Sequence, residues 1–391
     1  MPVTKPLTIV ADAHIWGLKS ACMSLSGCDV TLHALESKDI TRDALADADV
    51  LLTRSATRVN GDLLAGTPVR FAATATIGDD HYDKAYLQEK DITFANAAGS
   101  STGSVIEYML TVLLDLHIRN CIDIPETTIG IIGAGRIGNA LAQHCRSMGM
   151  NVLINDPPRA RSEGGEGFSS LDTMLTQANL LSLHTPLIRQ GQDKTVHLLD
   201  QYQLQRFQGE GIINAARGAC VDNEALCEWL DGSHERFAAL DCWEHEPGVS
   251  ARLLGHPRMA ITTPHIAGHS LDGKAANTLY IYRALCGWLG ISPTWGLRDS
   301  LPASQKSMDI ECIDDAFVNV HRAASLLCPL QRDSMTMKAW AILPEQQLAT
   351  AFATYRRHYP VRRAWSFAPV HLHRADTQTM ELAHAIGLTT V

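Results

Sequence analysis

Three short segments in the second half of the chain contain side chains that could move a proton and hold a carboxylate. Arg217 lies in an Asn-Ala-Ala-Arg-Gly segment, Glu246 in an Asp-Cys-Trp-Glu-His-Glu-Pro segment, and His265 directly after a proline. Oxidation of an alcohol carbon requires a base for the hydroxyl proton, a group that orients the base, and a cation for a neighbouring carboxylate. Each residue alone is more often structural, but together they favour catalysis by His265, Glu246 and Arg217.

A glycine motif upstream could bind the phosphates of a dinucleotide. Gly133-x-Gly135-x-x-Gly138 follows the apolar run 128–132 directly and begins a helical pattern at Arg136. The first glycine permits a tight turn, the second lets the backbone approach a pyrophosphate, and the third lets helix and strand pack closely. The helix N-terminus then presents free N–H groups to the phosphates. We therefore predict a dinucleotide site; the alternative is a glycine-rich turn without a ligand.

The acidic residue after the next apolar run indicates which dinucleotide binds. Asp156 lies 21 residues after Gly135. A carboxylate at this place accepts hydrogen bonds from the ribose hydroxyls and repels a 2′-phosphate, which favours NAD over NADP. Two alternatives stay open: Asp156 is only a loop cap, or Arg159 and Arg161 accommodate a phosphate. We expect these arginines to be surface charges beside Pro157 and its neighbouring proline.

The elements that position these residues alternate between strands and helices. Short apolar runs predict buried strands at 7–11, 50–53, 69–75, 92–96, 128–132, 151–155, 180–186, 211–216, 237–241 and 260–265. Helical patterns at 19–26, 43–48, 104–119 and 136–148 separate several of them. This alternation is typical of an α/β fold with parallel sheets, in which ligands bind beyond the carboxyl ends of the strands.

The length of 391 residues favours two or three domains. We expect two doubly wound parallel-sheet domains, Rossmann-like or flavodoxin-like, and a small α+β domain. A substrate-binding domain would comprise 1–103 and 267–291, and an NAD-binding domain 104–266. The segment 292–307 is rich in Pro, Ser and polar residues, and it would lead into a C-terminal domain within 292–391.

Composition argues against several classes of protein. A formal net charge of −9 is unlike a general nucleic-acid or membrane-surface binder. The ten cysteines include no C-x-x-C pair and no zinc-type spacing, so we expect free thiols in a reducing compartment and no metal site. The N-terminus has no signal-like apolar stretch, and the most apolar helical run, 105–118, is too short to span a membrane. We expect a cytoplasmic protein.

The order and separation of the three catalytic segments resemble the D-2-hydroxyacid dehydrogenase family, whose pattern is N-x-x-R-G, then L-D-x-x-x-x-E-P, then P-H-x-A. The resemblance implies that Arg217 clamps the substrate carboxylate and that His265 is the acid/base. It also implies that Glu246 orients His265 and raises its proton affinity, and that Asp241 lies near the nicotinamide. The expected NAD contacts are Gly133, Gly135, Arg136, Ile137, Gly138, Asp156, Thr185, Ala215, Ala216, Asp241 and Gly268.

Other segments are similar to one subgroup of that family, the erythronate-4-phosphate dehydrogenases. They are LTRSATRVN at 52–60, ATIGDDH at 75–81, RGACVDN at 217–223 and HIAGHSLDGK at 265–274. The resemblance implies NAD-dependent oxidation of 4-phospho-D-erythronate to (R)-3-hydroxy-2-oxo-4-phosphooxybutanoate in pyridoxal 5′-phosphate biosynthesis, and a homodimer formed through the C-terminal domain. The expected contacts with this small phosphorylated hydroxy acid are Arg54, Ser55, Arg58, Thr76 and His269.

Three positions depart from the subgroup's pattern. His269 replaces a tyrosine, Ser101 replaces an asparagine, and Asp-Ala-His at 12–14 replaces an acidic run. His269 could still donate a hydrogen bond to a phosphate.

Near the C-terminus, one of Arg332, Arg362 and Arg363 could reach a neighbouring active site.

Two other functions remain open at this point. Another D-2-hydroxyacid dehydrogenase, such as a 3-phosphoglycerate dehydrogenase, would explain the catalytic segments equally well but not the segments at 54–60 and 272–274. An NAD-sensing binding protein similar to the corepressors of this fold could keep all three of Arg217, Glu246 and His265. Apolar runs within 317–391 favour an ordered C-terminal domain and thus an enzyme.

Overall fold

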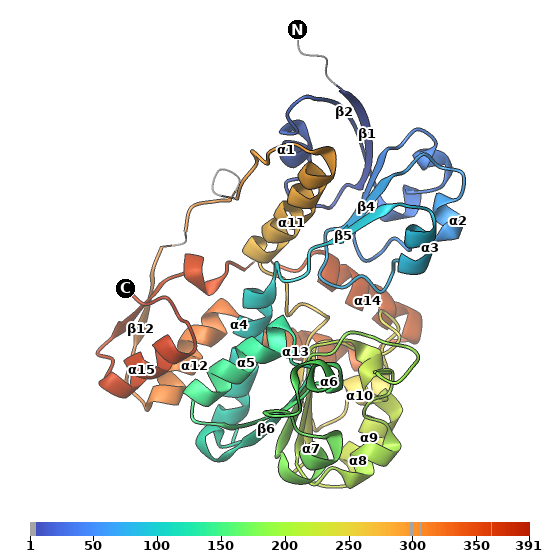
Figure 1. Cartoon of the computed structure of the whole chain (residues 1–391). Helices are drawn as coiled ribbons and strands as arrows, with labels where there is room; N and C mark the ends of the chain where they lie inside the picture. Colours follow the sequence, from blue (N-terminus) through green and yellow to red (C-terminus); the bar gives the residue numbers. More distant parts are fainter. Residues whose placement is uncertain (1–4, 298–300, 305, 361) are drawn as a thin grey trace. The chain divides into compact units, whose positions relative to one another are not determined.

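The computed structural model describes residues 5–297, 301–304, 306–360 and 362–391 (Figure 1). Contacts divide the chain into two compact units, each with a core of its own. Unit 1 comprises Met1–Ser101 and Ser270–Ala303, and unit 2 comprises Thr102–His269 and Ser304–Val391. Residues 298–300 and 305 of the expected linker lie outside the described residues.

Unit 1 is built on a five-stranded parallel sheet in the order β2-β1-β3-β4-β5. Its strands are β1 Lys5–Asp12, β2 Cys28–Leu35, β3 Val50–Thr53, β4 Phe71–Thr74 and β5 Thr93–Asn96. Its helices are α1 Leu18–Met23, α2 Gly61–Leu64, α3 Lys84–Glu89 and α11 Leu271–Leu289. One apolar cluster joins the sheet to α1 and α11, and a second joins it to α2 and α3. Helices therefore cover both faces, as a doubly wound fold requires.

Unit 2 contains a six-stranded parallel sheet in the order β11-β10-β9-β8-β6-β7. Its strands are β6 Thr128–Ile132, β7 Asn151–Asn155, β8 Leu180–Leu183, β9 Gly211–Asn214, β10 Phe237–Leu240 and β11 Met259–Thr262. The helices before and between them are α4 Thr102–Ile118, α5 Arg136–Ser147, α6 Pro157–Glu163, α7 Leu171–Gln177, α8 Gln201–Arg206, α9 Asn223–Asp231 and α10 Ala251–Leu254. Apolar clusters on both faces explain why β8 to β11 are buried throughout.

The C-terminal segment of unit 2 adds helices and a two-stranded parallel sheet (orange to red in Figure 1). Its elements are β12 Met308–Glu311, α12 Ala316–Leu327, α13 Leu330–Lys338, α14 Glu345–Arg357, β13 Val370–His373 and α15 Thr377–Ala385. Helix α12 packs against α4, and α13 packs against β11. The expected helices and strands are present, while a dimerisation role for this segment stays a prediction.

One expected element was wrong, and one strand was not predicted. The pattern at 43–48 predicted a helix, but the structure has only a 3₁₀ turn, Asp43–Leu45. Strand β2 was not predicted, because an edge strand needs no continuous apolar run. Its side chains alternate between exposed and half-buried. Further 3₁₀ turns are Ser37–Asp39, Ile124–Glu126, Gly218–Cys220, Ala339–Ile342 and Trp365–Phe367.

In the part of the chain that the structure describes, no helix is both long and apolar enough to cross a bilayer.

Candidate active site

The predicted catalytic and cofactor residues of unit 2 follow the carboxyl ends of its strands. Because all neighbouring strands of this sheet are parallel, these ends lie at one edge. The edge is the usual place for ligands in open α/β sheets. The first residues after β6, β7, β8, β9, β10 and β11 are Gly133, Asp156, His184, Ala215, Asp241 and Thr263.

The glycine turn has the backbone geometry that a pyrophosphate site requires. Gly133 has φ +94°, and a Cβ atom there would lie 2.8 Å from the carbonyl carbon of His184. At Gly138 a Cβ atom would lie 1.9 Å from the Gly133 carbonyl oxygen. By contrast, a Cβ atom at Gly135 would meet nothing within 4 Å. The turn is therefore packed tightly on the protein side and open at Gly135, where α5 begins, so the residues present fit a dinucleotide.

Asp156 is both a helix cap and a support of the glycine turn. Its Oδ1 accepts a hydrogen bond from the Arg159 N–H (3.1 Å), and its Oδ2 accepts one from the Ala134 N–H (2.8 Å). Each carboxylate oxygen retains a further lone pair for a ribose hydroxyl. Arg159 pairs with Glu163 and donates to the Ala134 carbonyl, while Arg161 pairs with Asp193. Both arginines thus have acidic partners, which weakens the case for a 2′-phosphate site.

Replacing Asp156 by Asn should relax the preference for NAD. The amide keeps an oxygen for the Arg159 N–H, so the cap survives, but its NH₂ cannot accept the Ala134 N–H, and the glycine turn loses that support. The charge that repels a 2′-phosphate is also lost. We expect kcat/KM with NADP relative to NAD to rise by about tenfold, which corresponds to about 1.4 kcal/mol. Steady-state kinetics with both cofactors measures this ratio, and an unchanged ratio would remove Asp156 from the specificity argument.

The segment after β8 lies against the glycine turn. The backbone of His184 is the surface that excludes a side chain at Gly133. Burial lowers the pKa of His184 to about 4, so its imidazole is neutral near pH 7. Thr185, an expected cofactor contact, has its hydroxyl 3.4 Å from the Cys220 sulfur.

Arg217 follows β9 in a loop that Asn214 shapes. The Asn214 side chain accepts a hydrogen bond from the Ala216 N–H (3.1 Å) and donates one to the Arg217 carbonyl (2.9 Å). The half-buried guanidinium of Arg217 donates from Nη1 to the Ala216 carbonyl (2.7 Å). At Gly218 a Cβ atom would lie 1.8 Å from the Trp243 carbonyl oxygen. Glycine therefore lets the Arg217 loop pack directly on the segment that follows β10.

His265 and Glu246 form a hydrogen-bonded pair. Nδ1 of His265 lies 2.8 Å from Oε2 of Glu246, and Oε1 of Glu246 accepts the Trp243 N–H (2.8 Å). Burial alone would raise the pKa of Glu246, but His265 and the two hydrogen bonds outweigh burial and place the pKa below its usual value. Glu246 is therefore a carboxylate near neutral pH. The bond to Nδ1 leaves Nε2 of His265 as the ring nitrogen available to a substrate.

Asp241 anchors the loop that bears His265. Its buried carboxylate accepts hydrogen bonds from the Thr263 hydroxyl (2.7 Å) and from the N–H groups of Ile266 (2.7 Å) and Ala267 (2.9 Å). Its backbone carbonyl also accepts the His265 N–H (2.7 Å). This loop includes His265 at φ +56°, a conformation that costs energy for a residue with a side chain. Asp241 thus has a clear structural role, and its contact with the nicotinamide stays a prediction.

Sequence reasoning missed a second support of the His265 loop, from the C-terminal segment of the same unit. Arg356 donates from Nε to the His265 carbonyl (3.2 Å), and Arg362 donates from Nη2 to the Ala267 carbonyl (3.0 Å). Arg362 also pairs with the buried Glu107 of α4 (2.7 Å). Among the three arginines considered for a neighbouring site, Arg362 is thus engaged within its own chain. The only feature of the sequence that could have indicated these contacts was the group of arginines within 355–363.

Replacing Arg362 by Met should destabilise the protein strongly. The buried Glu107 carboxylate would lose its partner, and such losses cost about 3–5 kcal/mol. We expect the midpoint of urea unfolding to fall accordingly. In the double variant with Glu107→Gln, the uncompensated charge is removed and much of the loss should be recovered. A single variant within about 0.5 kcal/mol of the parent would show that the pair is not important for stability.

The expected substrate contacts are divided between the two units. In unit 1, Arg54 follows β3 and is half-buried, whereas Ser55 and Arg58 are exposed. The Thr76 hydroxyl, after β4, donates to the Gly78 carbonyl (2.8 Å) and lies 2.7 Å from the Thr74 hydroxyl. The fifth residue, His269, ends the 102–269 part of unit 2, with its ring centroid 6.3 Å from that of Tyr359.

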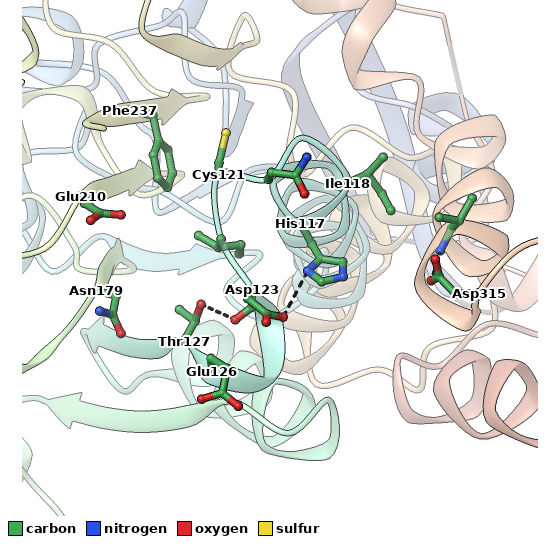
Figure 2. Close-up of a pocket in the computed structure, with 13 residues that line it drawn as sticks. His117, Ile118, Cys121, Asp123, Glu126, Thr127, Asn179, Glu210, Phe237 and Asp315 are labelled. Carbon is green, nitrogen blue, oxygen red and sulfur yellow. Dashed lines mark hydrogen bonds and ion pairs between the residues drawn. The ribbon is translucent and has the colours of Figure 1, made fainter. Parts of the chain in front are cut away.

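A cavity of about 550 Å³ in unit 2 lies at the opposite edge of the sheet. Its lining includes Thr127, Asn179, Glu210 and Phe237, at or next to the amino ends of β6, β8, β9 and β10. Figure 2 shows the polar side chains around it, with the His117–Asp123 ion pair on one side. Because the glycine turn and His265 lie at the carboxyl ends, this cavity is not the cofactor site.

Comparison with known proteins agrees with this geometry. Residues 117–267 match the model of the D-isomer specific 2-hydroxyacid dehydrogenase, NAD binding domain. An erythronate-4-phosphate dehydrogenase of Pseudomonas syringae pv. tomato is 39% identical over 98% of this chain and 100% of its own length. One from Pseudomonas aeruginosa UCBPP-PA14 is 40% identical over 85% of this chain and 88% of its own length.

The chain belongs to the D-isomer-specific 2-hydroxyacid dehydrogenase family, among the erythronate-4-phosphate dehydrogenases. It is an NAD-dependent dehydrogenase.

Solved structures of other dehydrogenases share the fold. The D-lactate dehydrogenase of Aquifex aeolicus, solved with NAD and lactic acid, has a TM-score of 0.61 and 20% identity, covering 72% of this chain and 95% of that one. The NAD-dependent formate dehydrogenase of Staphylococcus aureus, solved with NAD, has a TM-score of 0.60 and 23% identity, covering 72% and 96%. The two doubly wound domains of this dehydrogenase are thereby confirmed.

Proposed function

We propose that this dehydrogenase oxidises 4-phospho-D-erythronate to (R)-3-hydroxy-2-oxo-4-phosphooxybutanoate in pyridoxal 5′-phosphate biosynthesis. The observation that carries the proposal is the His265–Glu246 pair at 2.8 Å, which lies at the same sheet edge as the open glycine turn. The name shared by relatives that match nearly the whole chain supports this substrate.

The chain's own groups account for the proton and for the carboxylate. NAD, when bound, accepts the hydride from the alcohol carbon. Nε2 of His265 takes the hydroxyl proton, because Nδ1 is held by the Glu246 carboxylate. Glu246 stabilises the imidazolium that forms, and the Trp243 N–H fixes the orientation of Glu246. Arg217 holds the substrate carboxylate through paired hydrogen bonds.

The NAD site in this proposal combines the glycine turn with neighbouring strand ends. The N–H groups at the start of α5, around Gly135, Arg136, Ile137 and Gly138, would face the pyrophosphate. Asp156 would accept bonds from the adenosine ribose. Thr185, Ala215, Ala216, Asp241 and Gly268 would complete the site.

The substrate phosphate in this proposal binds to unit 1. Arg54 and Arg58 supply cations at the carboxyl end of β3, and Ser55 lies between them with an exposed hydroxyl. Thr76 follows the adjacent strand β4, so the four residues belong to neighbouring strand ends of one sheet. His269, the fifth expected substrate contact, belongs to unit 2, and its role stays a prediction.

The proposal extends to a homodimer formed by the C-terminal segment. Several large apolar side chains of this segment are exposed, among them Ile313, Leu326, Met335 and Ile342, the last with 91% exposure. Contiguous patches of exposed apolar side chains are typical of an interface between proteins, and the proposal places such a patch on this segment. Sedimentation equilibrium tests this part: we expect a dimer, and a monomer would exclude it. A cytoplasmic location stays a prediction.

Formation of NADH from different phosphorylated acids tests the substrate. We expect turnover with 4-phospho-D-erythronate and much lower kcat/KM with 3-phosphoglycerate. Where NADH stays tightly bound, an added 2-oxo acid re-oxidises it, and turnover is then measured as the 2-hydroxy acid formed from that added acid. The reverse preference would support the 3-phosphoglycerate dehydrogenase alternative. Binding of NAD without turnover of either acid would support a sensing role.

A further inference from the structure

The exposed face of the small β12–β13 sheet gathers three potential metal ligands. Asp309 lies directly opposite His371 in the parallel register, and His373 lies two residues further along β13. Since side chains two residues apart in a strand point to the same face, both imidazoles lie on the side of Asp309. The opposite face, with Ile310, is buried in the core of unit 2. This cluster is outside the catalytic site and its elements.

We propose that Asp309, His371 and His373 form a binding site for a divalent transition metal of the zinc class. Two imidazoles and a carboxylate are donors that Zn²⁺ accepts, with a fourth position left for water or another ligand. The site goes beyond the proposed dehydrogenase activity and does not depend on it.

The distances between donor atoms agree with a shared ion. Nδ1 of His371 lies 3.6 Å and Nε2 of His373 lies 2.7 Å from Oδ1 of Asp309, and all donors lie within 4.8 Å of one another. Bonds of about 2.0–2.1 Å in a tetrahedron place donor atoms about 3.4 Å apart. The hydrogen bond of 2.7 Å between His373 and Asp309 would therefore open by about 0.7 Å, and the donors up to 4.8 Å apart would approach by up to about 1.4 Å, through side-chain rotation. The two rings are also close, with centroids 4.0 Å apart.

The charge and exposure of the face also suit a cation. Glu311, opposite His373 in the register, is exposed and adds a second negative charge. The Asp309 side chain is 70% exposed and the His371 side chain 49% exposed, so an ion can enter from solvent without opening the core. The His371 and His373 imidazoles bind metal in their neutral form, so binding releases any proton they hold.

Two other clusters of potential ligands are less suitable. Cys227, Asp231 and His256 lie close together, but Arg252 donates to Asp231 (2.9 Å) and brings a positive charge to that place. Burial also raises the pKa of the Cys227 thiol, which disfavours the thiolate that binds metal.

The third cluster, Cys242 with Glu246 and His265, shares its imidazole and carboxylate with the proposed catalytic pair. Burial raises the pKa of the Cys242 thiol well above its usual value. The β12–β13 face therefore remains the best candidate among the described residues.

Calorimetric titration of the chelator-treated full-length protein with Zn²⁺ tests the site. We expect one Zn²⁺ per chain, and the same site should give Co²⁺ a visible absorption band. Asp309→Asn, His371→Asn and His373→Asn should each weaken Zn²⁺ binding by at least about tenfold, the lower end of what loss of a supporting group costs. Asp309 and His371 are exposed and His373 is half-buried at the same face, so circular dichroism should show unchanged folding.

His384→Asn is the matched control, because His384 lies in the same segment and contacts Thr390 rather than the cluster. This variant should bind Zn²⁺ as the parent does. NADH formation without added metal should be unchanged in Asp309→Asn. The absence of saturable Zn²⁺ binding, or equal affinity in the parent and all three ligand variants, would overturn the proposal.

Discussion

Replacing His265 by Asn should lower kcat by about 10²–10⁴-fold, the usual contribution of general acid–base catalysis. Asn is the appropriate replacement because His265 has φ +56°, a conformation that Asn tolerates better than Ala. Its amide cannot accept the hydroxyl proton at neutral pH, whereas the loop held by Asp241 should keep its shape. Binding of NAD, measured by calorimetry, should therefore stay within about twofold of the parent, which is about 0.4 kcal/mol.

Glu246→Gln is the companion variant for this prediction. Because the folded pKa of Glu246 is below its usual value, its favourable interaction with His265 is present near neutral pH and is lost as the pH falls through that folded pKa. Removing the charge makes a protonated His265 less stable. The acid limb of the kcat/KM profile should then move to lower pH, with a lower maximum. If His265→Asn kept near-parent turnover, or the profile of Glu246→Gln did not move, the pair would not be the acid/base unit.

Replacing Arg217 by Met should lower kcat/KM by about 10²–10⁴-fold. Hydrogen bonds to charged groups contribute about 1.5–3 kcal/mol each, and the planar fork of Arg217 can make two to one carboxylate. The loss of about 3–6 kcal/mol corresponds to that range. The loop itself should persist, since Asn214 and Gly218 shape it through backbone contacts.

Arg217→Lys separates charge from geometry. Lysine keeps the positive charge but lacks the paired donors, so we expect activity between those of the Met variant and the parent. Rates and NAD affinity are measured in the same preparations. Activity of Arg217→Met close to that of the parent would show that another cation holds the substrate carboxylate.

The residues at the carboxyl edge of the unit 2 sheet could be predicted from the sequence, because each of them is marked by its own neighbours in the chain. The glycine turn follows an apolar run directly, and Arg217, Glu246 and His265 each lie at the end of such a run or within five residues after it. In a parallel sheet, residues that follow the carboxyl ends of different strands lie at the same edge, so their positions along the sequence are enough to predict that they share a site. The structure adds the hydrogen-bond distance between the proposed acid/base and its partner, 2.8 Å from Nδ1 of His265 to Oε2 of Glu246.

The supports of that edge could not be predicted, because they join residues far apart in the chain. Arg362 reaches Glu107 and Ala267, and no periodicity or motif in the sequence pairs them. The sequence also had no signal for the hydrogen bonds of the Asp241 carboxylate with the N–H groups of Ile266 and Ala267, while its expected contact with the nicotinamide stays a prediction. Strand β2 was missed since its alternating side chains resemble those of a loop.

The most direct measurement of the central claim compares 4-phospho-D-erythronate with erythronate that lacks the phosphate. Initial rates of NADH formation give kcat/KM for both acids in the parent and in Arg58→Gln. We expect a large preference of the parent for the phosphorylated acid, and a smaller preference in the variant. Equal kcat/KM for the two acids in the parent would contradict this expectation.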